Sequence, residues 1–220
     1  MKETWVRART PDQKERRIRQ ILSAAVRLLK SQSIDDITMG MIAEEAAFTR
    51  SNLYRYFTTR EEVFLSILKE DLVAWVRALP EDLGSAALPA EGFSKIWIDS
   101  FLANSRMNDL LSVLSTKLEA GSSVEALMEF KIRISGLYRE EAEAICKVIP
   151  GLSRPSAYRM LMLRSALVVG AYPAINPTGK QRDALSQAGI PIAAEQYRQM
   201  MIDSISAFIG ALVADDPKTE

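Results

Sequence analysis

Apolar residues recur at a helical spacing along nearly the whole chain, and no window shows the sustained alternation that is typical of a strand. The first long segment shows this pattern clearly, because Ile18, Ile21, Leu22, Ala25 and Leu29 form one apolar stripe. Amphipathic helices are stable in water when such stripes pack against one another. The sequence therefore predicts an all-α protein, and 220 residues are enough to bury a substantial core.

Capping residues divide the N-terminal part of the chain into short helices. Thr10 and Thr59 each open a capping box, in which a Gln or Glu follows three residues later. Thr38 and Thr49 can each cap a shorter helix. The helices expected here are one carrying the Ile18 to Leu29 stripe, two short ones over 38–46 and 49–56, and a long one from 60 to about 79.

The remaining chain has the pattern of longer helices. Ser122 and Glu125 make a third capping box. Two stretches rich in proline and glycine, Pro80–Gly92 and Tyr172–Pro191, are expected to be loops. The predicted helices lie at about 91–104, 107–119, 123–148, 154–171 and 193–213.

Composition places the chain among globular proteins, since 48% of its residues are hydrophobic and 25% are charged. Met1–Arg19 is polar and basic, unlike a secretion signal. The longest apolar stretch, from Ser165, is shorter than the roughly 20 residues that a membrane span needs. The single cysteine, Cys146, excludes an internal disulfide and fits a reducing compartment. We expect a cytoplasmic protein that makes no membrane contact.

Motifs for enzymatic chemistry are missing from the sequence. The chain contains no histidine, which removes the usual general base and most zinc sites. It also lacks a phosphate-binding Gly-rich loop, a dinucleotide fingerprint and a nucleophile elbow. We therefore expect no catalytic residues, no metal and no cofactor.

Charge is distributed unevenly although the formal net charge is zero. Residues 1–60 hold 12 Lys and Arg against 7 Asp and Glu, a net charge of +5, and the remainder carries −5. Within the basic part, the helices at 38–46 and 49–56 are joined by only a few residues, which is the spacing of a helix-turn-helix. Leu53 and Phe57 can pack inward on Ile42, leaving the polar side chains of the second helix free for the DNA major groove.

The segment ITMGMIAEEAAFTRSNLYRYFTTREEVFLSIL, which begins at Ile37, resembles the DNA-binding domain of TetR-family transcriptional regulators. The resemblance covers about residues 12–68. Arg60 stands where a lysine is common, and Ala47 stands where the turn usually has glycine, which suggests a turn conformation that tolerates a Cβ. The resemblance implies DNA base contacts by Arg50, Ser51, Asn52 and Arg55, and phosphate contacts by Thr38, Thr49, Tyr54, Tyr56 and Arg60.

The same resemblance implies two domains. The first is a three-helix DNA-binding domain at 1–68, whose connecting helix continues to about 79. The second is a larger helical domain at 69–220 that binds an effector and forms a homodimer.

Apolar residues of the middle helices are candidates for the effector pocket: Phe93, Trp97, Phe101, Met107, Leu110, Leu114, Met128, Tyr138 and Met162. Candidates for the dimer interface are Leu167, Gly170, Met201, Ile205, Phe208 and Leu212. Each of these side chains could equally fill the core of its own chain. Lys117, Arg133 and Arg164 could meet an acidic ligand or lie on the surface.

These patterns predict a transcriptional regulator that a small molecule of unknown identity releases from a palindromic DNA operator, with repression as the expected mode. The basic tail, Met1–Arg9, is expected to enter an adjacent minor groove. The alternative is a helical interaction or scaffold protein that never binds DNA. Salt dependence of binding to duplex DNA separates the two.

Overall fold

The computed structural model describes residues 11–216, and every regular element in that range is helical. The described residues form two compact units: the first comprises 11–67 together with 116–130, and the second comprises 68–115 and 131–216. The predicted cap at Thr10 and the basic tail before it lie outside the described residues. Residues 116–130 thus group with the N-terminal unit, and a domain boundary at residue 68 stays a prediction.

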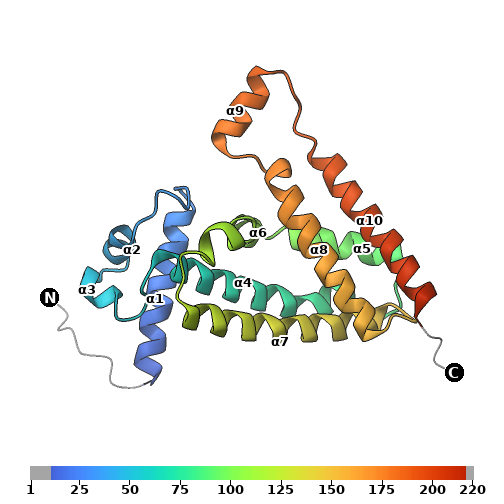
Figure 1. Cartoon of the computed structure of the whole chain (residues 1–220), viewed down its shortest axis with the longest axis horizontal. Helices are drawn as coiled ribbons and strands as arrows, with labels where there is room; N and C mark the ends of the chain where they lie inside the picture. The colour runs from blue at the N-terminus through green and yellow to red at the C-terminus, as the bar shows by residue number, and fades with distance from the viewer. Residues whose placement is uncertain (1–10, 217–220) are drawn as a thin grey trace. The chain divides into compact units, whose positions relative to one another are not determined.

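The N-terminal unit contains α1 (Pro11–Leu29), α2 (Met39–Glu45), α3 (Arg50–Leu53) and the first part of α4 (Arg60–Leu83). α2 packs against both α1 and α3 (Figure 1). The core of this unit is apolar, with Ile21, Ile37, Ile42 and Leu53 fully buried. α3 is shorter than the predicted 49–56, because its last residues continue as turns after Leu53.

Residues 116–130 include most of a π-helical turn (Leu114–Leu118) and the start of α7 (Val124–Val148). The predicted capping box at Ser122 is wrong by one residue. Ser123 Oγ accepts the hydrogen bond from Ala126 N, whereas Ser122 Oγ donates to the carbonyl of Leu118. A π-helical turn has one extra residue per turn, which displaces the start of the following segment.

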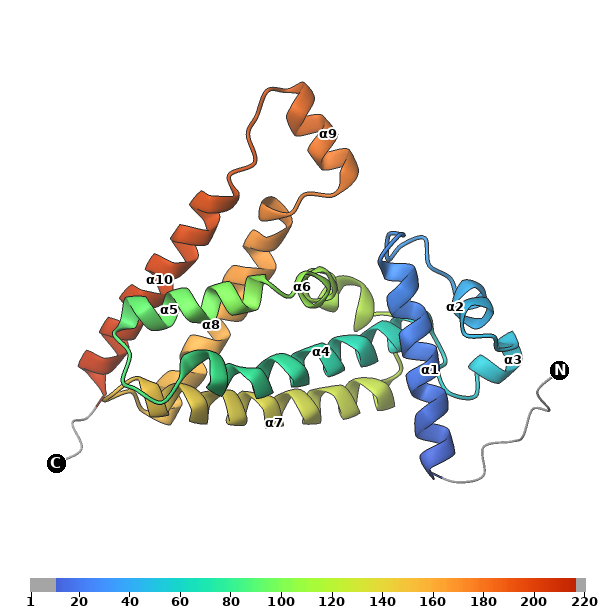
Figure 2. The same ribbon diagram turned by 180° about the vertical axis from the view of Figure 1, so that it is seen from behind.

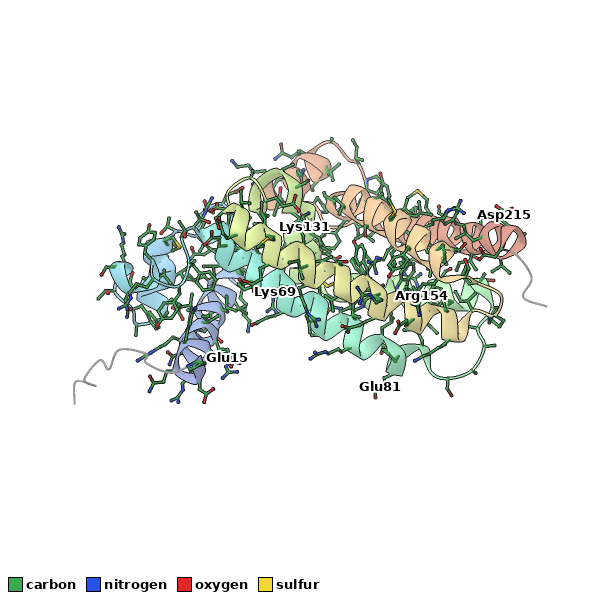
Figure 3. The ribbon with its side chains drawn as sticks, turned by 60° about the horizontal axis from the view of Figure 1, so that its bottom comes forward. Glu15, Lys69, Glu81, Lys131, Arg154 and Asp215 are labelled. Atoms are coloured by element: carbon green, nitrogen blue, oxygen red, sulfur yellow. The ribbon has the colours of Figure 1, made fainter. Side chains whose placement is uncertain are left out.

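The second unit contains the rest of α4 and α7, with α5 (Ala90–Leu102), α6 (Ser105–Ser112), α8 (Arg154–Ile175), α9 (Gly179–Gln187) and α10 (Ala194–Asp215). α10 packs against α5 and α8, and α6 packs against α8. Figure 2 shows α9 at one end of the α8–α10 pair. α4 and α7 run alongside each other in Figures 1 and 2. Figure 3 labels Lys69 on α4 and Lys131 on α7.

Both predicted loops are shorter than expected. α4 continues through Pro80 and stops before Gly84, whose φ of 70° ends the helix. A proline removes one backbone hydrogen bond and crowds the carbonyl of the preceding turn, but the turn after it can still form, and Gly84 N donates to the carbonyl of Pro80 at 3.1 Å. Within the second predicted loop, Thr178 and Gln181 form a capping box that starts α9, and Gly189 follows its end with a φ of 67°. That box was present in the sequence, but the neighbouring prolines and glycines obscured it.

No helix among residues 11–216 is both long enough and apolar enough to span a lipid bilayer.

Candidate functional site

The two threonines predicted to cap the helix-turn-helix do so. Thr38 Oγ1 accepts a hydrogen bond from Met41 N at 3.2 Å, and Thr49 Oγ1 accepts one from Asn52 N at 3.3 Å. Each cap satisfies an amide that has no partner within its own helix. Short local hydrogen bonds therefore fix where α2 and α3 begin.

Ala47, in the turn between these helices, has a φ of 55°. The sequence suggested a turn that tolerates a Cβ, but the turn keeps the left-handed conformation in which glycine is favoured. Phe48 N donates to the carbonyl of Ala43 at 2.7 Å, and Ala47 N donates to Glu44 at 3.0 Å. These bonds hold Ala47 in a conformation that costs an L-residue about 1–2 kcal/mol.

α3 presents two different faces. Leu53 and the following Phe57 are buried in the N-terminal unit, as the spacing predicted. The opposite face, which we call the recognition face, is polar and mostly solvent-exposed. It consists of Arg50, Ser51, Asn52, Tyr54 and Arg55, of which only Asn52 is partly buried.

The side chain of Arg50 lies over the start of α2. A Cβ added to Gly40 would come within 2.9 Å of Arg50 Cζ, so the guanidinium rests where only glycine leaves room. The absence of a side chain at Gly40 therefore shapes the position of the first arginine on the recognition face. Sequence reasoning missed this residue, because a glycine inside a short helix carries no signal about a side chain ten positions later.

Two of the predicted phosphate donors are engaged within the protein. The ring of Tyr56 meets Phe48 edge-on, with centroids 6.2 Å apart. Arg60 Nη1 donates to the backbone carbonyls of Ile34, Asp35 and Ile37 at 3.2, 2.8 and 2.7 Å. The guanidinium of Arg60 thus joins the start of α4 to the segment before α2.

The segment 116–130 is tied to the N-terminal unit by polar contacts. Lys117 Nζ lies 2.6 Å from one carboxylate oxygen of Asp35 and 2.7 Å from the other. Glu62 Oε1 accepts hydrogen bonds from the amide and the hydroxyl of Ser123, and its Oε2 accepts one from Thr58 N at 2.7 Å. Burial raises the pKa of Glu62, but these hydrogen bonds together lower it below the ordinary value.

The second unit brings together part of the predicted effector pocket. Five of the nine residues are buried in its core: Phe93, Trp97, Phe101, Met107 and Leu110. Leu114 and Tyr138 are partly buried. Met128 and Met162 are 59% and 69% exposed, so neither lies in a buried pocket.

A charged pair lies among these aromatic residues. Arg164 on α8 and Glu141 on α7 are 2% and 1% exposed and form an ion pair through Arg164 Nη1. Trp97 Nε1 donates to the same carboxylate oxygen at 2.9 Å. Burial raises the pKa of Glu141, although Arg164 opposes the shift. The other two basic residues considered for an acidic ligand also lie near carboxylates. Lys117 pairs with Asp35, and Arg133 Nη1 lies 3.4 Å from Glu140 Oε1.

A second polar cluster joins α6 to α8. Tyr172 Oη donates to the carbonyl of Ser105 at 3.2 Å and accepts from Asn176 at 3.1 Å. Burial and the nearby Asp109 carboxylate raise the pKa of Tyr172 to about 12. This phenol therefore stays protonated and acts as a structural hydrogen-bond donor.

The predicted dimer residues divide between core and surface. Met201, Ile205 and Leu212 are at most 1% exposed and pack inside their own unit. Leu167 and Phe208 are partly buried, and Arg159 lies over the ring of Phe208 at 5.6 Å. A Cβ added to exposed Gly170 would meet no atom within 4 Å. The exposed surface of α8 around Gly170 is apolar and includes Met162, Ala166, Val169 and Pro173.

An apolar pocket of about 510 Å³ lies where α9 meets the end of α8 and the start of α10. Its lining includes Leu185, Ile190, Ile192 and Tyr197. Ile190 and Ile192 are 55% and 40% exposed, and α9 contributes no buried residue.

Two family models match the chain almost end to end. The model of bacterial regulatory proteins of the tetR family matches residues 21–67, and the model of the tetracyclin repressor-like C-terminal domain matches residues 69–214. The chain belongs to the TetR family. Two curated relatives match part of this TetR-family protein. An uncharacterized HTH-type regulator, YfiR of Bacillus subtilis (strain 168), is 34% identical over 70 residues, which are 32% of this chain and 34% of the relative.

The fatty acid metabolism regulator protein of Bacillus subtilis (strain 168) is 27% identical over 79 residues, 36% of this chain and 41% of that protein. The chain thus spans about a third to two fifths of the curated relatives it matches. Among solved structures, AlkX from Dietzia sp. has a TM-score of 0.55 at 14% identity, covering 94% of this chain and 100% of AlkX. FadR from Bacillus subtilis, solved with stearoyl-CoA, has a TM-score of 0.51 at 15% identity, covering 89% and 97%. At these identities the likeness shows a shared fold.

Proposed function

We propose that this TetR-family protein is a transcriptional repressor that binds double-stranded DNA through α3 and leaves it when a small effector binds the second unit. The recognition face carries the proposal. Arg50, Ser51 and Arg55 are exposed and Asn52 is partly buried, while Leu53 fixes the helix to the core. Arginine and asparagine recognise guanine and adenine by paired hydrogen bonds. The types of donor on this face, rather than their exposure, therefore favour DNA binding over a scaffold role.

Binding to DNA is tested with a selected operator and with random duplex. Arg50→Ala is expected to weaken operator binding by roughly 5- to 150-fold and to relax the preference at one base pair, as the loss of a base contact does. Arg77→Ala is the matched control, because Arg77 is an exposed arginine on α4 in the second unit. Equal effects of both substitutions, or affinity that does not change with salt, would favour the scaffold alternative.

Homodimerisation through the exposed apolar face of α8 is the second part of the proposal. A dimer places two recognition faces on the two halves of a palindromic operator. Because the space beside Gly170 is open, Gly170→Arg adds bulk and charge to this face without a clash inside the chain. We expect it to convert dimers to monomers in analytical ultracentrifugation, whereas Ser135→Arg at an exposed site on α7 does not. Dimers that persist in Gly170→Arg would remove α8 from the interface.

The effector acts by shifting an equilibrium between two arrangements of the protein, and it does so only through its differential affinity for them. Two helices can carry that shift, since α4 and α7 each begin in the N-terminal unit and continue in the second. Leu114 precedes the Lys117 contact and is partly buried. Leu114→Trp is expected to lower operator affinity as a bound effector does. Unchanged operator affinity with a full effector response would reject this mode of coupling.

A further inference from the structure

Arg164 lies in an unusual environment for an arginine. Its guanidinium carbon lies 4.9, 4.9 and 4.8 Å from the ring centroids of Trp75, Trp97 and Phe101, all in the second unit. Among residues 11–216, the charge paired with it is that of Glu141, which it meets through Nη1. Removing two charges from water costs several kcal/mol per ion, and the attraction between them offsets this only when their remaining hydrogen bonds are made.

Those hydrogen bonds are incomplete. Among residues 11–216, two buried side-chain atoms have no hydrogen-bond partner, and they are Arg164 Nε and Asn108 Oδ1. Both adjoin Phe101: Arg164 lies over its ring, and Asn108 Nδ2 donates to its backbone carbonyl at 2.9 Å. A buried donor without a partner has lost its hydrogen bond to water, and this loss raises the free energy of the folded state. The polar atoms near Phe101 therefore include a donor, Arg164 Nε, that can still take an acceptor.

We propose that Arg164 anchors the carboxylate of an apolar acid through Nε, and that Glu141 is the neighbouring carboxylate whose charge opposes this effector. The proposal rests on the proposed function, since it names the chemical class of the effector. Arginine binds a carboxylate best through two parallel hydrogen bonds, and the edge of the guanidinium that carries Nε has no acceptor. The body of the acid must be apolar, because the rings of Trp75, Trp97 and Phe101 surround the guanidinium.

The same rings and carboxylate could instead suit an organic cation, because aromatic faces attract positive charge. That position is already filled by the guanidinium on three ring faces. The unpaired atom is moreover a donor, which a cation cannot satisfy. The geometry therefore favours an anion, and a cation of equal length serves as a control.

Glu141→Gln gives the sharper of two tests. One oxygen, Glu141 Oε1, accepts from both Arg164 and Trp97, and the amide oxygen of glutamine can accept the same two hydrogen bonds. The substitution removes the opposing charge while keeping the shape. It is expected to raise affinity for an acid, whereas a purely structural ion pair would give no gain.

Arg164→Lys is the second variant. Lysine keeps the positive charge but lacks the flat fork that pairs with a carboxylate. We expect affinity for an acid to fall roughly 10- to 150-fold, which is the effect of losing a hydrogen bond to a charged group. Thermal unfolding of both variants identifies any loss of fold, and if Arg164→Lys does not fold, Glu141→Gln decides alone.

The experiment measures binding of four probes with one chain length to full-length protein by calorimetry without DNA. The probes are dodecanoate, dodecanol, dodecyltrimethylammonium and dodecanoyl-CoA. We expect wild type to bind dodecanoate more tightly than the others, Glu141→Gln to strengthen only dodecanoate, and Arg164→Lys to weaken only dodecanoate. Preference for dodecanoyl-CoA would replace the free acid with a thioester, and so would overturn an anchored carboxylate.

Equal dodecanoate affinity in wild type and both variants, tighter binding of the cation, or no binding of any probe to wild type would each overturn the proposal. None of these results bears on DNA binding, which the Arg50→Ala and Arg77→Ala comparison tests separately. Salt-independent binding to duplex DNA would conversely reject the proposed function even if dodecanoate binds as expected.

Discussion

Replacing Arg60 with alanine tests whether this residue binds DNA phosphate or holds the N-terminal unit together. The substitution removes a guanidinium that donates to three carbonyls at 2.7 to 3.2 Å, belonging to Ile34, Asp35 and Ile37. Hydrogen bonds from charged donors are worth about 1.5–3 kcal/mol each when buried. The Arg60 side chain is 28% exposed, so water can replace part of each bond. Because Nη1 has two hydrogens, the three contacts share two hydrogen bonds, and at about 1.5 kcal/mol each the loss is about 3 kcal/mol.

Hydrogen exchange is the suitable assay, because a two-unit protein need not unfold in one step. A loss of about 3 kcal/mol corresponds to a roughly 100-fold faster exchange of protected amides in α2 and at the start of α4. Arg60→Lys is the matched control, since it keeps the charge, but its side chain is one atom shorter than the arginine whose Nη1 reaches the three carbonyls. We expect it to recover about a third to two thirds of the protection.

The opposite result would support a phosphate contact. In that case Arg60→Ala would leave exchange unchanged, weaken all DNA sequences alike, and reduce the slope of log affinity against log salt by about 0.9. Arg60→Lys would then restore both affinity and slope. That combination would refute a structural role for the guanidinium.

Three further substitutions test local features of the N-terminal unit. Ala47→Gly relieves the left-handed strain at a φ of 55°, whereas the greater entropy of glycine in the unfolded chain opposes this gain. We expect the free energy of unfolding to rise by about 0.5–1 kcal/mol, seen as slower hydrogen exchange, with unchanged operator affinity. Gly40→Ala places a Cβ against the flexible end of Arg50, so operator affinity should fall roughly 5- to 150-fold while random duplex binds as before; equal loss on both would contradict a positioning role. Glu62 has a lowered pKa, so its contribution to stability is present above the ordinary carboxyl value and disappears as pH falls through the lowered one. Denaturation followed from about pH 6 to about pH 3 should show a flatter stability profile for Glu62→Gln than for wild type, and parallel profiles would contradict this.

The helical class and the helix-turn-helix were determined by the sequence itself. Their signals are local: an apolar period of 3.6 residues, and threonine caps at Thr38 and Thr49 whose hydrogen bonds reach only three residues ahead. The separation of Leu53 from the recognition face follows from the same period. Such features depend on the nearest turn of helix, so the order of residues is enough to predict them.

Tertiary structure alone decided which partner each exposed or charged residue finds. Arg60 reaches carbonyls 23 to 26 positions earlier in the chain, and Arg164 meets a carboxylate 23 positions earlier. Met201, which could have joined a dimer interface or the core, lies in the core. An apolar helix must be buried, but its sequence does not say against what. A charge alone likewise does not identify its partner, because that partner is chosen by the packing of distant helices and the water that this packing excludes.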